Sequence, residues 1–226
     1  ASNIEKAQSV INFLAEKGMN FVRIRNSNSP GRMHPDKSNN YYLPEGFQNS
    51  KDCLKLAIMA HNAKMKIQYT FNYSDYWSNG ERQDIPADWM DSIKGIHDNQ
   101  KIVEKLADCI YNYTLGVMKE LATNQIYPEY VSLGNETNGG FLFPYGYSYD
   151  VTWDNTDMPR GSQNWNAIAT FINAGYKAVK EVSPYSKIVI HLADNTNDFI
   201  KYNSNVNSYT YSWYFDNLIK HNAKFD

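Results

Sequence analysis

Glu129-Tyr-Val-Ser-Leu-Gly-Asn-Glu136 joins a short β-type run to an amide and a carboxylate side chain. The run predicts a strand over residues 129–134. A helix is predicted before it, because residues from Ile102 to Leu121 are apolar at three- and four-residue spacing. Another helix is predicted after a long loop, at about 163–182. The strand therefore lies between two helices.

The same alternation of helix and strand continues toward both ends of the chain. Further strands are predicted at 20–25, 66–72 and 187–191, and further helices at about 4–14, 50–63 and 212–221. This alternation favours parallel βα units. The loops after the strands are long and rich in Asn, Asp and Trp, which is typical of barrels whose active site lies at the carboxyl ends of the strands.

The number of strands limits what these residues form. Four complete strands are predicted in 226 residues, whereas a closed barrel of this type has eight. We therefore expect an α/β fold, a (β/α)8 TIM barrel of which this chain supplies part, with one domain over residues 1–226. We expect the first strand before Ala1 and the last three beyond Asp226. The start at Ala1, without a methionine or a leader, indicates a processed or cut chain.

Composition excludes several classes of function. With 22 Lys and Arg against 24 Asp and Glu, the formal charge is −2, so nucleic acid is not an expected partner. No apolar run approaches the length of a membrane span. The five histidines lack ligand-like spacing, so neither a metal nor a cofactor is expected. Cys53 and Cys109 fall on apolar helix faces, which favours two free buried thiols over a disulfide.

Glu136 is the strongest candidate for a catalytic residue. It follows a strand, so its carboxyl group is expected to point into the barrel mouth, where partial burial favours the protonated form that a general acid needs. Such an acid protonates a glycosidic oxygen. Asn135 could bind a sugar hydroxyl next to the reacting carbon. The alternative is a strand-end Asn-Glu pair that only caps the next loop.

Other polar residues end the neighbouring strands. Arg23 and Arg25 share one strand face and need acidic partners; a structural ion pair is the alternative to a catalytic carboxylate. Asn72 and Asp75 suit hydroxyl recognition, and Trp77 suits stacking on a sugar ring, against the alternative of a turn with a packed tryptophan.

His191 closes the fourth predicted strand and is followed by Asp194 and Asn195. A lone histidine at such a position is more often a hydrogen-bonded core residue than a ligand. Arg, Asn, Glu and His at the ends of four successive strands are harder to explain by chance, and together they favour one site.

Six short stretches, in order and over nearly the whole chain, resemble the endo-β-1,4-galactanases of glycoside hydrolase family 53. They are Asn20-Phe-Val-Arg-Ile-Arg25, Phe71-Asn-Tyr-Ser-Asp75 with Trp77, Val131-Ser-Leu-Gly-Asn-Glu136, Gly140-Phe-Leu-Phe-Pro144, Ile188-Val-Ile-His-Leu192 and Trp213-Tyr-Phe-Asp216. The resemblance implies a retaining hydrolase that acts on a polysaccharide, the β-1,4-galactan or type I arabinogalactan of pectin side chains.

The resemblance also implies roles for individual residues. The family's acid/base glutamate and its preceding asparagine fall on Glu136 and Asn135, and its strand-end arginine falls on Arg25. The stacking tryptophan falls on Trp77, and the strand-end histidine falls on His191 with Asp194 and Asn195 after it.

The chain departs from the family pattern at several places. Thr70-Phe-Asn72 stands where the family has Asp-Phe-His, Asn26-Ser27 stands where a tryptophan is expected, and Phe143 replaces another tryptophan. These changes concern fine specificity more than reaction type. The changes at Thr70 and Asn72 also support the alternative hypothesis, a catalytically weak or inactive galactan-binding relative.

A retaining mechanism needs a second carboxyl group, the nucleophile. The family's nucleophilic glutamate is expected outside this segment, and none of Glu45, Glu81 or Glu129 is a convincing substitute. A polymeric substrate implies a secreted, periplasmic or cell-surface protein.

Overall fold

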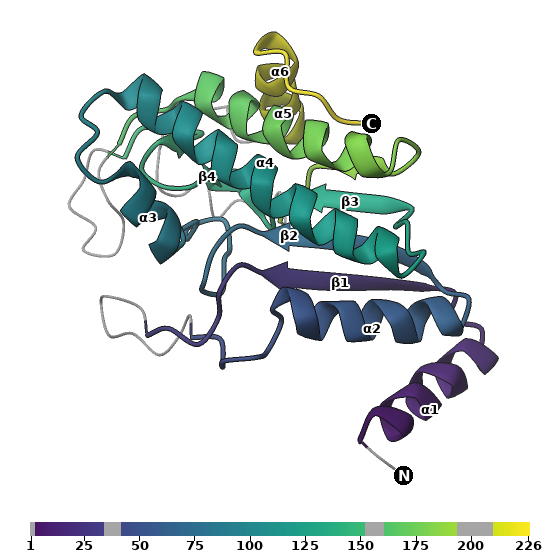
Figure 1. Cartoon of the computed structure of the whole chain (residues 1–226). Coiled ribbons are helices and arrows are strands. Elements are labelled where there is room, and N and C mark those ends of the chain that lie inside the picture. The colour runs from purple at the N-terminus through teal and green to yellow at the C-terminus, as the bar shows by residue number, and fades with distance from the viewer. Residues whose placement is uncertain (1–2, 34–41, 152–160, 194–209) are drawn as a thin grey trace.

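A computed structural model describes residues 3–33, 42–151, 161–193 and 210–226 (Figure 1). Four parallel strands form its main sheet, in the order β1-β2-β3-β6. They are β1 (Phe21–Ser27), β2 (Lys66–Asn72), β3 (Tyr130–Leu133) and β6 (Lys187–Val189). Apart from the short pair β4 and β5 between β3 and β6, strand order follows chain order, as in a (β/α) barrel, and these residues supply four adjacent strands of one.

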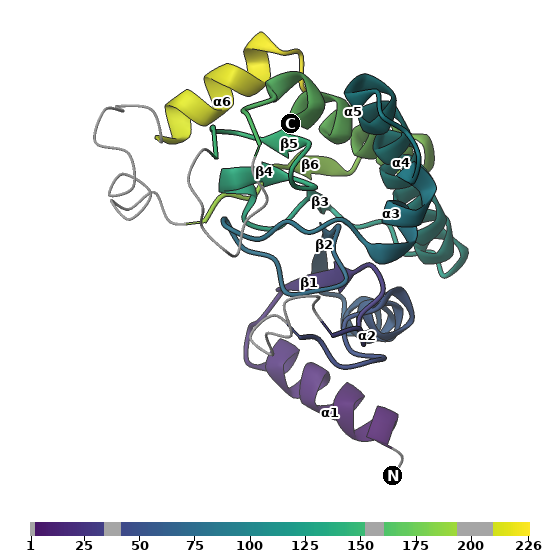
Figure 2. The ribbon, with the colours of Figure 1, turned by 90° about the vertical axis from the view of Figure 1, so that its left-hand side faces the viewer.

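Helices separate the strands along the chain. They are α1 (Asn3–Glu16), α2 (Ser50–Asn62), α3 (Ala87–Ile93), α4 (Asn99–Thr123), α5 (Trp165–Val182) and α6 (Tyr211–Lys220). Figure 2, which looks at the carboxyl ends of the strands, shows α2, α4 and α5 on one side of the curved sheet. None of the helices in the described ranges combines the length and apolarity needed to cross a membrane.

Polar residues before the helices determine where several of them begin. Asn49, Asp98, Asn164 and Thr210 each accept a hydrogen bond from a backbone N–H in the first turn of α2, α4, α5 and α6, respectively. Such caps satisfy N–H groups that have no partner inside the helix. Four of the five long helices predicted from periodicity therefore also have a local signal at their start.

The core lies between the sheet and its helices. Tyr69, Val131 and Ile188 from three strands are completely buried, and so are Leu106 and Ile110 of α4. The regular spacing of apolar residues in α4 and α5 follows from this contact, because one helix face packs inward while the other meets solvent. Both cysteines are free thiols, as predicted; Cys53 is also buried as predicted, whereas Cys109 is only half-buried.

Three local expectations were wrong. Helix α3 lies in a segment expected to be loop; it begins after Pro86 and buries Trp89 and Ile93, one turn apart. It is too short for periodicity to reveal it. Strand β6 ends at Val189, two residues before His191.

The segment after Glu136 is also more ordered than a loop. It contains the 3-10 turn Thr137–Gly139 and the antiparallel pair β4 (Gly140–Phe141) and β5 (Gly146–Tyr147). A side chain at Gly140 would place its Cβ 1.9 Å from the Gly146 carbonyl oxygen, and its φ is +113°. Only glycine permits both this conformation and this close approach, yet such two-residue strands have no period to recognise.

Candidate active site

The predicted polar residues meet where the main strands end, at the edge facing the viewer in Figure 2. Glu136 follows β3 and is partly exposed. Its backbone is left-handed, with φ 51° and ψ 55°. For a residue with a side chain, this conformation costs about 1–3 kcal/mol, so the surrounding contacts must hold it.

Glycine and histidine contribute to that turn. A Cβ at Gly134, whose φ is +91°, would lie 2.4 Å from the Thr137 methyl carbon, so the turn requires glycine. The Glu136 N–H donates to Nδ1 of His191 at 3.1 Å, and the Thr137 N–H donates to the His191 carbonyl at 2.9 Å. The ends of β3 and β6 are therefore tied together at the candidate acid.

Asn135 is buried and its amide is engaged at both ends. Its Nδ2 donates to the Ser78 carbonyl at 2.9 Å, and its Oδ1 accepts from Nη2 of Arg23 at 2.7 Å. Because a guanidinium can only donate, these partners determine which amide atom faces the arginine. The oxygen of Asn135 is thus aligned within the site rather than free to rotate.

The two arginines of β1 converge on this edge, as their shared strand face predicts. Arg23 donates to Oγ1 of Thr70 at 3.1 Å as well as to Asn135. Burial lowers the pKa of both guanidinium groups, and the charge of Glu136 opposes that shift in both. The carboxylate therefore acts on both cations, which fits the predicted role of an acidic partner.

His191 is neutral in this arrangement. Its Nδ1 accepts the Glu136 N–H and lies 3.3 Å from Nη2 of Arg23, so the ring proton belongs on Nε2. Burial lowers the pKa of His191, and the charges of Arg23 and Arg25 lower it further. Asp194 and Asn195, predicted to follow it in the site, lie outside the described residues.

Trp77 stacks on a cation of the site. The guanidinium carbon of Arg25 lies 3.6 Å from the ring centroid, and Arg25 also donates to Oε1 of Gln48 at 3.2 Å. Trp77 keeps 39% of its surface exposed. It is therefore positioned as a partly open aromatic surface at the edge of the site.

Asn72 and Asp75 are buried, unlike Trp77. Asn72 donates to Oγ of Ser27 and to the Tyr76 carbonyl, and Asp75 accepts from the N–H groups of Ser29 and Ala87. Burial raises the pKa of Asp75, against the lowering by these donors and by a nearby arginine. Their contacts connect the loops around the site and leave neither side chain open to a sugar in this structure.

One residue from a loop and one from α6 complete the site, and strand-end reasoning missed them. Gln83 donates to the carbonyls of Asn135 and Glu136, and the hydroxyl of Tyr214 donates to the Thr137 carbonyl at 2.7 Å. These contacts span 52 to 77 residues of sequence, and no spacing rule relates them. Only the presence of polar residues in loops after strands hinted at them.

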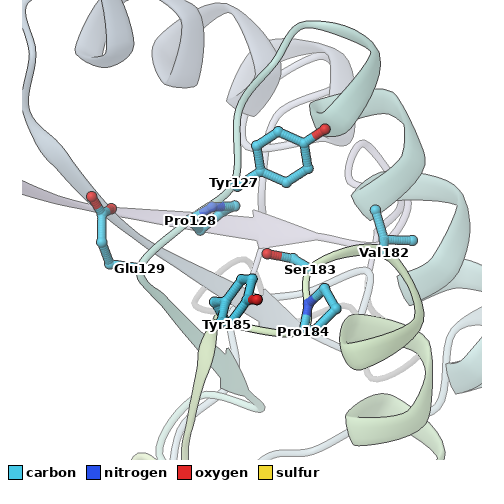
Figure 3. A pocket seen from close by; sticks show the side chains of 7 residues that line it. All are labelled: Tyr127, Pro128, Glu129, Val182, Ser183, Pro184 and Tyr185. Carbon is cyan, nitrogen blue, oxygen red and sulfur yellow. The ribbon is translucent and has the colours of Figure 1, made fainter.

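A separate pocket of about 400 Å³ lies at the opposite, amino ends of β3 and β6 (Figure 3). It is lined by Tyr127, Pro128, Glu129, Val182, Ser183, Pro184 and Tyr185. Glu129 accepts a hydrogen bond from the Ile67 N–H at 2.8 Å, so it supports the sheet far from Glu136. Within the described ranges, no group of three or more His, Cys, Asp or Glu residues could hold a metal ion.

Fold and site together define a class: a (β/α)-barrel protein with an Asn-Glu pair, arginines and a neutral histidine at the carboxyl ends of its strands. The model of glycosyl hydrolase family 53 matches residues 2–226, and the chain belongs to this family.

Individual relatives agree with that membership. The chain is 30% identical over 216 residues to an arabinogalactan endo-beta-1,4-galactanase of Thermothelomyces thermophilus, covering 95% of this chain and 51% of the relative. It is 31% identical over 155 residues to one of Cellvibrio japonicus, covering 67% and 36%. The chain thus spans about half the length, or less, of these relatives.

Solved structures give the same result. The GH53 catalytic domain of Ignisphaera aggregans matches with a TM-score of 0.70 and 28% identity, covering 96% of this chain and 49% of that one. A structure from a study of two fungal beta-1,4-galactanases matches with a TM-score of 0.67 and 28% identity, covering 95% and 51%.

Proposed function

We propose that this chain is part of a retaining, endo-acting glycoside hydrolase that cleaves β-1,4-galactosidic bonds in galactan. The observation that carries the proposal is Glu136 itself: a partly exposed carboxyl group at a strand end, in a constrained turn beside two arginines. The names of the relatives supply the substrate. A substrate of this kind lies outside the cell, so we also propose that the protein is secreted, periplasmic or surface-bound.

In the proposed reaction Glu136 first donates its proton to the leaving glycosidic oxygen. It then acts as a carboxylate and removes a proton from the water that opens the glycosyl-enzyme. Asn135 lies next to it, but Asn135 is buried and both ends of its amide are engaged, so it is proposed to act indirectly, by orienting Arg23. Trp77 is proposed to stack on a sugar ring.

The nucleophile is assigned outside the described residues. In a retaining enzyme its carboxyl group lies about 5–5.5 Å from the acid. Among the described residues, two carboxylates follow a main strand closely, Asp75 after β2 and Glu136 after β3. Asp75 is buried and accepts hydrogen bonds from the Ser29 and Ala87 N–H groups, so it is not proposed as the nucleophile. Asn72 and Asp75 are proposed to act indirectly, by positioning the loops around the site.

Glu136→Gln in the full-length protein tests the assignment. Glutamine keeps the shape but cannot donate a proton in the same way, so release of reducing sugar from galactan should fall by roughly 10²–10⁴-fold. An aryl galactoside whose leaving group needs no proton should lose much less in the glycosylation step. Equal losses on both substrates would contradict an acid role, and no activity in the wild type would favour a galactan-binding relative.

A further inference from the structure

Gln83 lies in the loop after β2, and its side-chain amide is buried against the turn that carries Glu136. The residue is 5% exposed. Its Nε2 donates to the carbonyls of Asn135 at 2.8 Å and Glu136 at 3.2 Å, and to the carbonyl of Asn79 in its own loop at 2.9 Å. One amide group therefore connects the loop after β2 to the end of β3.

The two carbonyl groups that accept from Gln83 lie on either side of the Glu136 Cα. The Asn135 carbonyl belongs to the peptide plane before the Glu136 Cα, and the Glu136 carbonyl belongs to the plane after it. The angles φ and ψ of Glu136 describe how these two planes are rotated about the Cα. Because the Gln83 amide binds both carbonyls, it restricts both φ and ψ of Glu136. These are the angles that place Glu136, the candidate acid, in its left-handed conformation.

Gln83 is itself well held. Its carbonyl accepts from the Phe143 N–H at 2.9 Å, which connects it to the segment after Glu136. Asn79 and Arg82 exchange two backbone hydrogen bonds, at 3.1 and 3.2 Å, so the loop that carries Gln83 is closed by a tight turn. Because the backbone around Gln83 is held in this way, its side-chain amide can restrict the peptide planes of Asn135 and Glu136 that it binds.

We propose that Gln83 is a positioning residue for Glu136: its amide fixes the left-handed backbone and thereby aims the carboxyl group. The inference rests on the proposed function, because it gives Gln83 a role through the acid. A displacement of about 1 Å at a reacting group can cost on the order of 10²-fold in rate. The aim of the carboxyl group should therefore depend on a donor that never touches substrate.

The test uses Gln83→Met in the full-length protein, since methionine keeps the length and loses both N–H donors. Release of reducing sugar from galactan should show kcat lower by about 10- to 100-fold with KM nearly unchanged. The activated aryl galactoside, which needs no acid, should lose less. Gln68→Met is the matched control: it removes a 2.7 Å hydrogen bond to Ser132 elsewhere on β2, and should leave the ratio of the two activities as in the wild type.

The outcomes separate the two claims. If Glu136→Gln reduces galactan hydrolysis but Gln83→Met keeps wild-type kcat, the positioning role is refuted and the proposed function stands. If Glu136→Gln has no effect, the proposed function itself fails. Equal losses by Gln83→Met on both substrates would assign Gln83 to the fold alone. Should Gln83→Met not fold, Gln83→Leu, which also removes both N–H donors and adds no charge, is judged by the same criteria.

Discussion

Trp77→Ala separates a binding surface from a packed side chain. Trp77 exposes 39% of its surface. Since a tryptophan can bury up to roughly 250 Å², about 100 Å² remains available to a ligand. At about 25 cal/mol per Å², covering half of that area with a sugar ring contributes about 1.2 kcal/mol, or roughly tenfold in Kd. We expect Trp77→Ala to weaken galactan binding by about this factor.

The same substitution should also lower stability, because about 150 Å² of the tryptophan is covered in the fold and, at about 25 cal/mol per Å², contributes up to about 4 kcal/mol. It removes the contact with Arg25, in which the guanidinium lies 3.6 Å from the ring centroid. A cation–π contact at an exposed site contributes about 0.5–1 kcal/mol. For a chain of this size, loss of this contact alone lowers Tm by roughly 1–4 °C, and loss of the covered apolar area adds to the fall.

Trp89 in the same segment provides the matched control. It is 8% exposed and packs against Tyr73 and Tyr113, with ring centroids 6.1 Å apart in both pairs. Trp89→Ala should therefore cost about 3–5 kcal/mol of stability and leave binding unchanged at temperatures where the variant is folded. Both substitutions should lower Tm, but only Trp77→Ala should also change Kd.

Affinity electrophoresis in galactan-containing gels gives Kd for the polymer, and thermal melts give Tm. Binding should be measured with Glu136→Gln as the common background, so that the polymer is not degraded during the run. A large fall in Tm for Trp77→Ala, with unchanged retardation in the gel, would refute the stacking role. Trp77 would then be a structural partner of Arg25 only.

Two further predictions follow from ionisation in the fold. Burial and two nearby arginines lower the pKa of His191, so below about pH 6.5, its ordinary pKa, the unfolded chain binds more protons and stability falls as pH falls. Thermal melts of His191→Gln between pH 7 and 5 should show a weaker decline, and an equal decline would contradict this. Burial raises the pKa of Cys53 to about 12. Native protein should therefore leave Cys53 unlabelled by Ellman's reagent at pH 8, and denatured protein should label it quickly.

Much of the site could be predicted because parallel strands end at a common edge. Arg23 lies on β1, Asn135 and Glu136 follow β3, and His191 follows β6. A polar residue near a strand end needs only the correct order of elements to reach the same place. The structure brings these four together even though β6 ends two residues earlier than expected. An approximate strand boundary was therefore sufficient to predict which residues meet in the site.

The loop contributions could not be predicted in the same way. Gln83 and Tyr214 reach the turn around Glu136 from loop and helix positions that no period relates to it. Trp77 and Trp89 also lie in one segment of similar composition, yet one is partly open and the other packs in the core. Burial of a loop residue depends on how distant segments pack, and local sequence does not encode that.

Electrostatics and backbone geometry are coupled at Glu136. The Glu136 N–H needs an acceptor, and Nδ1 of His191 can accept only while the ring is neutral. Burial lowers the pKa of the ring, and the charges of Arg23 and Arg25 lower it further, so cations that do not touch the Glu136 backbone help to preserve its left-handed turn. The charge of the Glu136 carboxylate in turn raises the pKa of both arginines, against the lowering caused by burial. The arginines thus act on the carboxyl group directly and, through His191, on the backbone that carries it.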